Sequence, residues 1–306
     1  AGPRAACCTP RNSGKRGLRG SRQDHRLRRG RRQGQGRMQG SGGAMVSFAA
    51  SVLAGVVFRR DAMRRLGPRN RSRIRVLLYG DSITEFGYNV GLSGWVAILA
   101  EWWSRKADLV NRGFAGYNTR MAAAMAEDII APEAPDVMFL FFGANDAGLG
   151  GVSTQHVPLE EYESNLGKII RTARAYNPRV QVVLIAPPPI WEPKLLEFLK
   201  ERGRTVLDRE NDNTKLYAEA CLRVAEAHST LAVDSWRLME GASERRAEYL
   251  IDGIHLNGRG NEALSGAIRE VLGTSAPHLT PEALPMHKPP WAEVDKDRPA
   301  RSLLRR

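Results

Sequence analysis

Cysteine is scarce in this sequence. Three cysteines occur in 306 residues: Cys7 and Cys8 are adjacent, and Cys221 lies far from both. A disulfide framework needs several spaced cysteines, and a Cys-rich zinc site needs paired ones. Both are excluded, and the cysteine content is typical of an intracellular or redox-indifferent protein.

Long apolar runs are also missing. A membrane-spanning helix needs about 18 or more consecutive apolar residues, and the sequence contains no such run. The longest apolar stretch near the start, Val46–Phe58, has the length of a signal-peptide core. It is followed by several arginines within 59–65 and by no obvious small-residue cleavage site. An Arg-rich, acid-poor leader is more typical of an organelle transit segment.

Acidic residues are nearly absent from one part of the chain. Residues 1–43 contain 12 Lys and Arg but a single acid, Asp24, whereas residues 274–306 contain 6 basic and 4 acidic side chains. The remaining 28 basic and 28 acidic residues in 44–273 cancel, so the net charge of +13 belongs to the ends of the chain. A basic groove across the folded body is therefore not predicted.

The basic leader offers a weak case for RNA binding. An Arg- and Gly-rich segment can bind RNA by charge alone, but residues 1–43 have no aromatic side chain to stack on a base. We therefore expect no nucleic-acid partner. Residues 1–72 are predicted to be a disordered leader, either a transit segment or an artefact of the gene model with Met45 or Met63 as the true start. The expected location is the cytoplasm, or a plastid or mitochondrion if the leader is genuine.

Strand and helix patterns alternate through the body. Short β-branched and aliphatic runs predict strands at 73–80, 107–114, 136–143, 180–186 and 230–234. Apolar residues at helical spacing predict helices at 95–105, 119–130 (with Thr119 as N-cap), 159–175, 208–228 and 257–272.

The order of these elements predicts a three-layer α/β/α domain over residues 73–273. It has a five-stranded parallel sheet of the flavodoxin-like kind. The third strand, DVMFLFFG, is nearly all apolar, which indicates burial on both faces. Right-handed crossovers place the strand-to-helix loops at one edge of the sheet, where ligands bind in such folds. Five prolines between residues 277 and 290 predict a non-globular, Pro-rich tail over residues 274–306.

Polar motifs stand at this edge. Ser82 follows the first strand, and His255 precedes the last helix. A serine hydroxyl becomes nucleophilic when an imidazole takes its proton, and a carboxylate orients that imidazole. Asp252 lies three residues before His255, a spacing that puts both side chains on one side of a turn. These three residues predict acyl-transfer chemistry.

An acyl-transfer site also needs donors for the oxyanion. The candidates are the backbone N–H of Gly116, the side-chain amide of Asn145 and the backbone N–H of Ser82. Each motif alone is more often a turn or a helix cap. Together and in this order, they favour a catalytic site.

The four motifs resemble those of the SGNH (GDSL-type) hydrolases. The strings YGDSIT, NRGFAGYNTR, FFGANDA and DGIHLN are most similar to the isoamyl-acetate-hydrolysing esterase branch. The resemblance implies that Ser82 is the nucleophile, His255 the base and Asp252 its orienting acid, with Ser82, Gly116 and Asn145 as the oxyanion hole. It implies no cofactor and no metal. Ile83 replaces the Leu of the family's name, a conservative change.

The expected function is hydrolysis of small acetyl-type esters. A carbohydrate deacetylase, a lysophospholipase or a thioesterase would use the same site. A non-catalytic α/β binding module is the alternative of another class, although no G-x-G-x-x-G or Gly-Lys-Ser/Thr phosphate loop is present. Trp191 is a candidate substrate-binding residue, with ordinary packing as the alternative. Residues 192–213 are interpreted as either a lid or a surface helix.

Overall fold

The computed structural model describes residues 73–241 and 243–304. Residues 1–72, with the predicted leader and both alternative start sites, lie outside the described residues. One five-stranded sheet is present in the described part, and all its neighbouring strands pair in parallel in the order β2-β1-β3-β4-β5. The strands are β1 (Ile74–Gly80), β2 (Ala107–Gly113), β3 (Val137–Phe141), β4 (Gln181–Ile185) and β5 (Leu231–Val233). The predicted fold class is confirmed.

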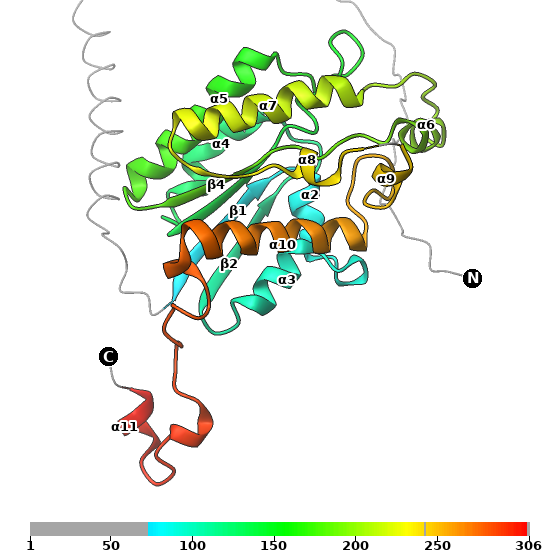
Figure 1. Ribbon diagram of the computed structural model, residues 1–306. Helices are drawn as coiled ribbons and strands as arrows, with labels where there is room; N and C mark the ends of the chain where they lie inside the picture. The colour runs from blue at the N-terminus through cyan, green and yellow to red at the C-terminus, as the bar shows by residue number, and fades with distance from the viewer. Residues whose placement is uncertain (1–72, 242, 305–306) are drawn as a thin grey trace, which may run out of the picture. The chain divides into compact units, whose positions relative to one another are not determined.

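Long helices cover both faces of this sheet (Figure 1). They are α3 (Trp95–Trp102), α4 (Thr119–Ile130), α5 (Leu159–Tyr176), α7 (Asn211–Ala227) and α10 (Gly258–Ser275). Helices α3 and α10 lie on one face, and α4, α5 and α7 lie on the other. We refer to these as the α3/α10 face and the α4/α5/α7 face.

Strand β3 shows why the central strands lack polar residues. Val137, Phe139 and Phe141 pack on the α3/α10 face. Met138 and Leu140, which alternate with them, pack on the α4/α5/α7 face. Since successive side chains of a strand point to opposite faces, burial on both faces requires an unbroken apolar run.

Two of the differences between predicted and observed helix starts have a clear physical cause. The N-cap of α4 is Asn118, whose side chain accepts a hydrogen bond from the N–H of Met121, whereas Thr119 was expected there. The Thr119 hydroxyl instead donates to the buried carboxylate of Asp146. Helix α7 begins at Asn211 rather than at residue 208, because the preceding residues enter a buried polar network described below.

Shorter elements complete the described chain. They are α2 (Ser82–Glu85), η1 (Phe86–Tyr88), η2 (Val90–Leu92), α6 (Glu192–Lys200), α8 (Ser235–Met239), α9 (Ser243–Ala247), η3 (Pro277–Leu279), η4 (Trp291–Glu293) and α11 (Pro299–Leu303). Helix α6 falls in the segment interpreted as a lid or a surface helix. Its Leu195 and Leu199 are buried in the α3/α10 face, so α6 packs on the domain through an apolar side.

The segment after α10 corrects the expectation of a wholly non-globular tail. Ala276, Leu279 and Leu284 are buried in the α3/α10 face. The indole N–H of Trp103 donates to the Leu279 carbonyl at 2.9 Å, and the Lys106 ammonium donates to the Leu284 carbonyl at 2.6 Å. Prolines therefore end α10 without ending the packed part of the chain.

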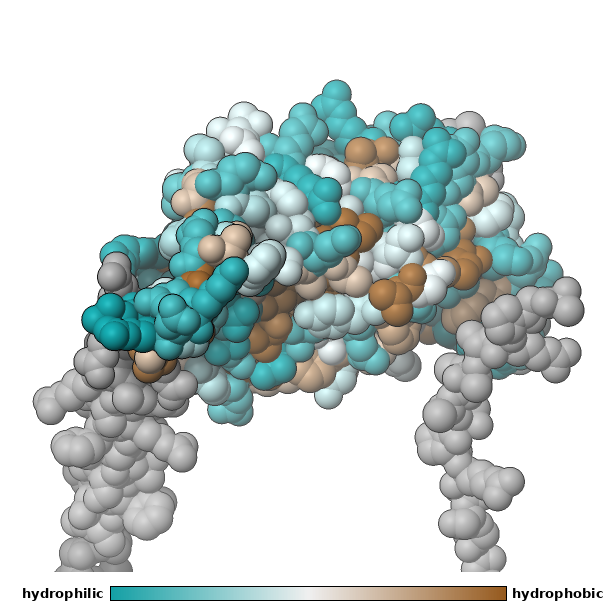
Figure 2. All heavy atoms as spheres, turned by 90° about the horizontal axis from the view of Figure 1, so that it is seen from below, coloured by the Kyte–Doolittle hydropathy of each residue, from teal (hydrophilic) through white to brown (hydrophobic). Residues whose placement is uncertain are grey.

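The surface of the described part is mixed. Figure 2 shows apolar side chains in separate patches among polar ones on the face it presents. Among the described residues, no helix combines the length and the apolar character that a membrane crossing requires.

Candidate active site

Ser82 is the first residue of α2, directly after the turn that follows β1 at the carboxyl edge of the sheet. Asp81 caps the short helix, because its carboxylate accepts the N–H of Ile83 at 2.9 Å. The N–H of Asp81 donates to the Phe141 carbonyl at the end of β3. Ser82 is 8% exposed. The turn is therefore held by hydrogen bonds to its backbone, and Ser82 keeps a small exposed fraction at the edge of the sheet.

His255 and Asp252 lie in the loop between α9 and α10. The Nε2 atom of His255 is 2.8 Å from the Ser82 Oγ atom, and its Nδ1 atom is 2.6 Å from the Asp252 Oδ2 atom. An ionised carboxylate can only accept hydrogen bonds. We therefore assign the imidazole proton to Nδ1, which leaves Nε2 free to accept the serine hydroxyl proton.

The environment of Asp252 favours its ionised form. Partial burial raises the pKa of this carboxyl, but the side chain of His255 and the backbone N–H groups of Ile254 and His255 outweigh that effect, and the net pKa is lowered. The two N–H groups donate to Asp252 Oδ1 at 3.0 and 2.8 Å. A carboxylate with three donors stays charged and keeps one orientation.

Gly253 allows this loop to fold tightly. Its φ is +93°, and a Cβ atom there would lie 2.5 Å from the backbone nitrogen of Leu195. Only glycine fits both conditions. The carbonyl of Gly253 accepts the N–H of Trp191 at 2.9 Å, so the start of α6 supports the loop that carries Asp252 and His255.

The oxyanion-hole candidates come from two neighbouring loops. Gly116 follows β2 and has a φ of +80°, and Asn145 follows β3. The Asn145 Nδ2 atom donates to the carbonyl of Tyr117 at 2.8 Å, which brings the two loops together. Asp81, beside Ser82, lies within electrostatic reach of both His255 and Asp146. The edge of the sheet therefore gathers all the predicted polar motifs.

Two buried carboxyls support these loops. Burial raises the pKa of Asp81 to about 7 and that of Asp146 to about 6. Asp146 accepts the backbone N–H of Thr119 at 2.9 Å, which ties the loop after β3 to the start of α4. Both carboxyls are almost fully buried next to residues of the site.

A small apolar cavity of about 130 Å³ lies beside His255. Ile83, Phe86, Ile251 and Leu256 contribute to its wall. The Phe86 ring packs against the imidazole with the ring centroids 5.4 Å apart. The space is large enough for a group of a few carbon atoms.

Trp191 is not among the residues that line this cavity. Its side chain packs against the α3/α10 face, and its backbone supports Gly253. A direct contact with substrate therefore stays a prediction. Within residues 73–241 and 243–304, no three His, Cys, Asp or Glu side chains are grouped to hold a metal ion.

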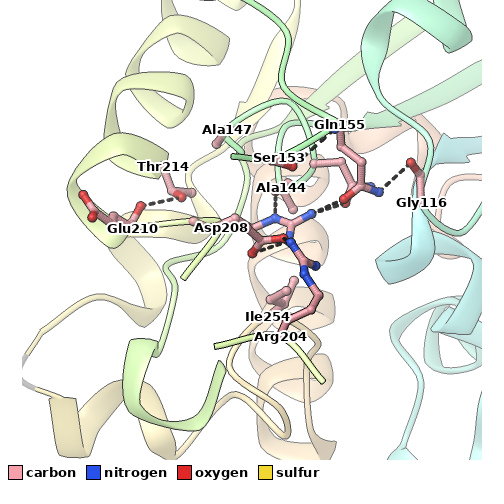
Figure 3. A network of polar contacts seen from close by, with 12 residues as sticks. Gly116, Ala144, Ala147, Ser153, Gln155, Arg204, Asp208, Glu210, Thr214 and Ile254 are labelled. Carbon is pink, nitrogen blue, oxygen red and sulfur yellow. Dashed lines mark hydrogen bonds and ion pairs between the residues drawn. The ribbon is translucent and has the colours of Figure 1, made fainter. Parts of the chain in front are cut away.

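A buried arginine that was not predicted from the sequence lies beside the loop that carries Asn145. Arg209 is 4% exposed and its neighbour Asp208 is 2% exposed. The Arg209 guanidinium donates to the side-chain oxygens of Asn145 and Gln155, and Gln155 in turn donates to the carbonyl of Gly116 (Figure 3). The only sequence signal was a charged stretch that resembles a solvated surface, because partners 54 and 64 residues away are not visible in a local pattern.

Comparison with known proteins decides the family. The sequence profile of the GDSL-like lipase/acylhydrolase family matches residues 78–263, more than half of the chain. The chain belongs to this family. This GDSL hydrolase is 40% identical over 236 residues to an isoamyl acetate-hydrolyzing esterase 1 homolog of Mus musculus, which covers 75% of this chain and 92% of the relative. It is 35% identical over 243 residues to a GDSL esterase/lipase of Arabidopsis thaliana, covering 76% and 99% of the two chains.

Solved structures show the same fold. A lipase/acylhydrolase from Enterococcus faecalis has a TM-score of 0.51 and 24% identity, covering 65% of this chain and 96% of that one. A catalytic mutant of Axe2, an acetylxylan esterase from Geobacillus stearothermophilus, has a TM-score of 0.51 and 20% identity, covering 65% and 94%. The resemblance drawn from the sequence motifs is confirmed, and this GDSL hydrolase is an enzyme of the carboxylesterase class.

Proposed function

We propose that the protein hydrolyses small carboxylic esters of the acetyl type through an acyl-enzyme on Ser82. The observation that carries the proposal is the unbroken hydrogen-bonded series from Asp252 through His255 to Ser82, with its distances of 2.6 and 2.8 Å. A nucleophile, its base and an orienting acid in such contact form the arrangement that acyl transfer needs.

The first half-reaction forms the acyl-enzyme. His255 Nε2 takes the proton of the Ser82 hydroxyl as Oγ attacks the ester carbonyl carbon. The negative charge of Asp252 stabilises the imidazolium that results. When the tetrahedral intermediate collapses, the carbon–oxygen bond to the alcohol breaks and the alkoxide takes the proton from Nε2. The alcohol then leaves, and the acyl group remains on Ser82.

The oxyanion of that intermediate requires donors that are already in place. We assign this role to the backbone N–H groups of Ser82 and Gly116 and to the Nδ2 group of Asn145. One Nδ2 hydrogen of Asn145 is used by the Tyr117 carbonyl, which leaves the second for the oxyanion. Loss of one such donor typically lowers the rate about 10²–10³-fold.

Water completes the reaction by the same route. His255 Nε2 takes a proton from water, whose oxygen attacks the acyl carbonyl. The second intermediate then releases the carboxylic acid and returns the proton to Ser82 Oγ. No residue beyond the three of the series is needed to move protons.

The size of the cavity favours short groups. Its volume of about 130 Å³ and the apolar side chains in its wall suit a small alkyl portion of the ester. Relatives named for hydrolysis of isoamyl acetate support the same substrate class. A deacetylase, lysophospholipase or thioesterase would share the catalytic residues and differ in this space.

Hydrolysis of p-nitrophenyl esters tests the proposal. The full chain and its Ser82→Ala variant are compared at equal concentration on acetate, butyrate, octanoate and decanoate esters. We expect kcat/KM to be highest for the acetate, and the alanine variant to lose about 10³-fold or more. Equal activity of the two proteins would remove Ser82 from the mechanism, and a preference for decanoate would overturn the assignment to small esters.

A further inference from the structure

We infer that Arg209 is a positioning residue of the oxyanion hole, and that its single guanidinium holds both Asn145 and Gly116 in their working orientation. This inference rests on the proposed function and names the group that maintains its geometry. Arg209 lies 64 residues from Asn145 in the sequence, in the segment that joins α6 to α7.

The Arg209 guanidinium is buried, and each of its three nitrogen atoms donates at least one hydrogen bond. Its Nε atom donates to the Ala144 carbonyl at 2.8 Å, and its Nη1 atom donates to both carboxylate oxygens of Asp208 at 3.0 and 3.1 Å. The Nη2 atom donates to Asn145 Oδ1 at 2.9 Å and also to Gln155 Oε1. A planar fork with donors in several fixed directions is suited to hold separate loops together.

The first consequence concerns the Asn145 side chain. The oxygen and nitrogen ends of an amide have nearly the same shape, so packing alone does not choose between its two orientations. Arginine can only donate. A flipped amide would therefore place an NH₂ group against the Arg209 guanidinium. The arginine directs Oδ1 toward itself and thereby directs Nδ2 toward Tyr117 and the site.

The second consequence concerns Gly116. Because Arg209 donates to Gln155 Oε1, the opposite end of that amide, Nε2, faces the Gly116 carbonyl and donates to it at 2.8 Å. Figure 3 shows the Gln155 side chain reaching toward Gly116, with Ala144 and Asp208 on other sides of the network. The peptide group of Gly116 is thus anchored at its oxygen, which limits rotation of the loop that carries the Gly116 N–H.

The positive charge of Arg209 also acts on the Asn145 side chain, in addition to orienting it. Asp208 also accepts from Arg204 at 3.0 Å, but the Arg204 side chain is 46% exposed and water screens its charge, whereas the charge of Arg209 is buried. That charge lies next to Asn145 Oδ1 and polarises the amide, which strengthens the Nδ2–H as a donor to a developing oxyanion. A lysine has one compact ammonium group and cannot span the Ala144, Asp208, Asn145 and Gln155 acceptors together.

A double-mutant cycle in the full chain tests the inference. The kcat and KM for p-nitrophenyl acetate are measured for the wild type, Arg209→Met, Asn145→Ala and the double variant. We expect Arg209→Met to lower kcat about 10²-fold with KM nearly unchanged. The double variant should be no more than about tenfold worse than the poorer single variant, because both single changes remove the Asn145 interaction and only the contact to Gly116 is lost in addition. Effects that multiply, or an unchanged kcat in Arg209→Met, would overturn the inference.

Three further variants separate positioning from general damage to the fold. Arg204→Met removes a cation from the same Asp208 carboxylate, but Arg204 is more exposed, at 46% of its side chain; its kcat should stay within about threefold of wild type. Arg209→Lys keeps the charge and loses the fork, and should fall at least about tenfold. Gln155→Ala removes the contact to Gly116 and one acceptor of Arg209 but keeps the Arg209–Asn145 hydrogen bond, and we expect a kcat loss of about tenfold with normal thermal unfolding. An unchanged kcat in Gln155→Ala would contradict the inference that Arg209 positions Gly116 through Gln155.

A spectroscopic measurement distinguishes failure of the inference from failure of the esterase proposal. The side-chain amide signals of Asn145, identified by their loss in Asn145→Asp, are followed in ¹H–¹⁵N spectra. They should shift in Arg209→Met and stay in place in Arg204→Met. If Ser82→Ala is as active as wild type but these signals shift, the esterase mechanism fails and Arg209 still orients Asn145. If Ser82→Ala is inactive and the signals do not move, only the Arg209 inference fails.

Discussion

The Oγ atom of Ser82 and the Nε2 atom of His255 lie 2.8 Å apart, although 173 residues separate them in the chain. The end of β1 fixes the first residue, and the loop before α10 fixes the second. Both elements reach the same edge of the sheet because every strand runs in the same direction. This contact, extended by Asp252, supports the proposed chemistry and leads to the following predictions.

Asp252→Asn should lower kcat about 10⁴-fold, the loss seen when the orienting acid of a catalytic triad becomes an amide. An asparagine can present an NH₂ group to His255 Nδ1, which would favour the tautomer with its proton on Nε2. Steady-state kinetics on p-nitrophenyl acetate measure the loss, and thermal unfolding confirms that the variant is folded. A loss below about tenfold would show that Asp252 does not orient the base.

Asp81→Asn should increase stability more at alkaline than at acidic pH. The pKa of Asp81 is raised from 3.8 to about 7, chiefly by burial. A raised carboxyl pKa contributes stability that is present below the unfolded value and is lost as pH rises through the folded value. The gain of the variant over wild type should therefore grow from about pH 4 to pH 8, by at most about 4 kcal/mol.

Denaturant unfolding of wild type and Asp81→Asn across this range measures the effect. The asparagine keeps an oxygen that can accept the Ile83 N–H. The exposed Asp128→Asn serves as the control for removing one formal charge. A stability difference that is constant with pH would contradict the raised pKa of Asp81.

Gly253→Ala should damage the site and the fold together. Its added Cβ atom would lie 2.5 Å from the Leu195 nitrogen at a φ of +93°. We expect a loss of about 1–3 kcal/mol in the free energy of unfolding and a kcat at least about tenfold lower, because the His255 loop must shift. Gly266→Ala in α10, where a Cβ atom meets nothing within 4 Å, should instead stabilise by about 0.5–1 kcal/mol. Similar changes in stability and kcat for Gly253→Ala and Gly266→Ala would contradict the role of Gly253 in shaping the loop that carries His255.

Leu284→Ala should destabilise the domain by about 2–3 kcal/mol, since Leu284 is 9% exposed and packs in the α3/α10 face. The matched change Leu304→Ala removes a side chain that is 73% exposed and should alter stability by less than about 0.5 kcal/mol. Urea unfolding followed by tryptophan fluorescence compares them. A neutral Leu284→Ala would mean that the segment after α10 does not support the domain.

The helix boundaries show which features of the fold a local sequence pattern could predict and which it could not. The start of α10 was predicted within one residue, and the structure shows Asn257 as its cap, accepting the N–H of Gly260. The start of α7 was not, because Asp208 and Arg209 look like the first charged residues of a helix while their side chains are used by Arg204, Asn145 and Gln155. A capping signal is local, whereas those bonds depend on loops that are distant in sequence.

The sequence by itself determined the parallel sheet, its family and the residues that meet at its edge. Apolar runs and helical periodicity are local properties, and Ser82, Asp252 and His255 each stand in a recognisable motif. Only the tertiary structure decided that Arg209 is buried against Asn145 and that Leu279 and Leu284 pack under α3 and α10. The composition of a charged or proline-rich stretch does not show whether the stretch is buried or exposed. Its burial depends on whether distant partners satisfy its hydrogen bonds, and only the folded chain brings those partners together.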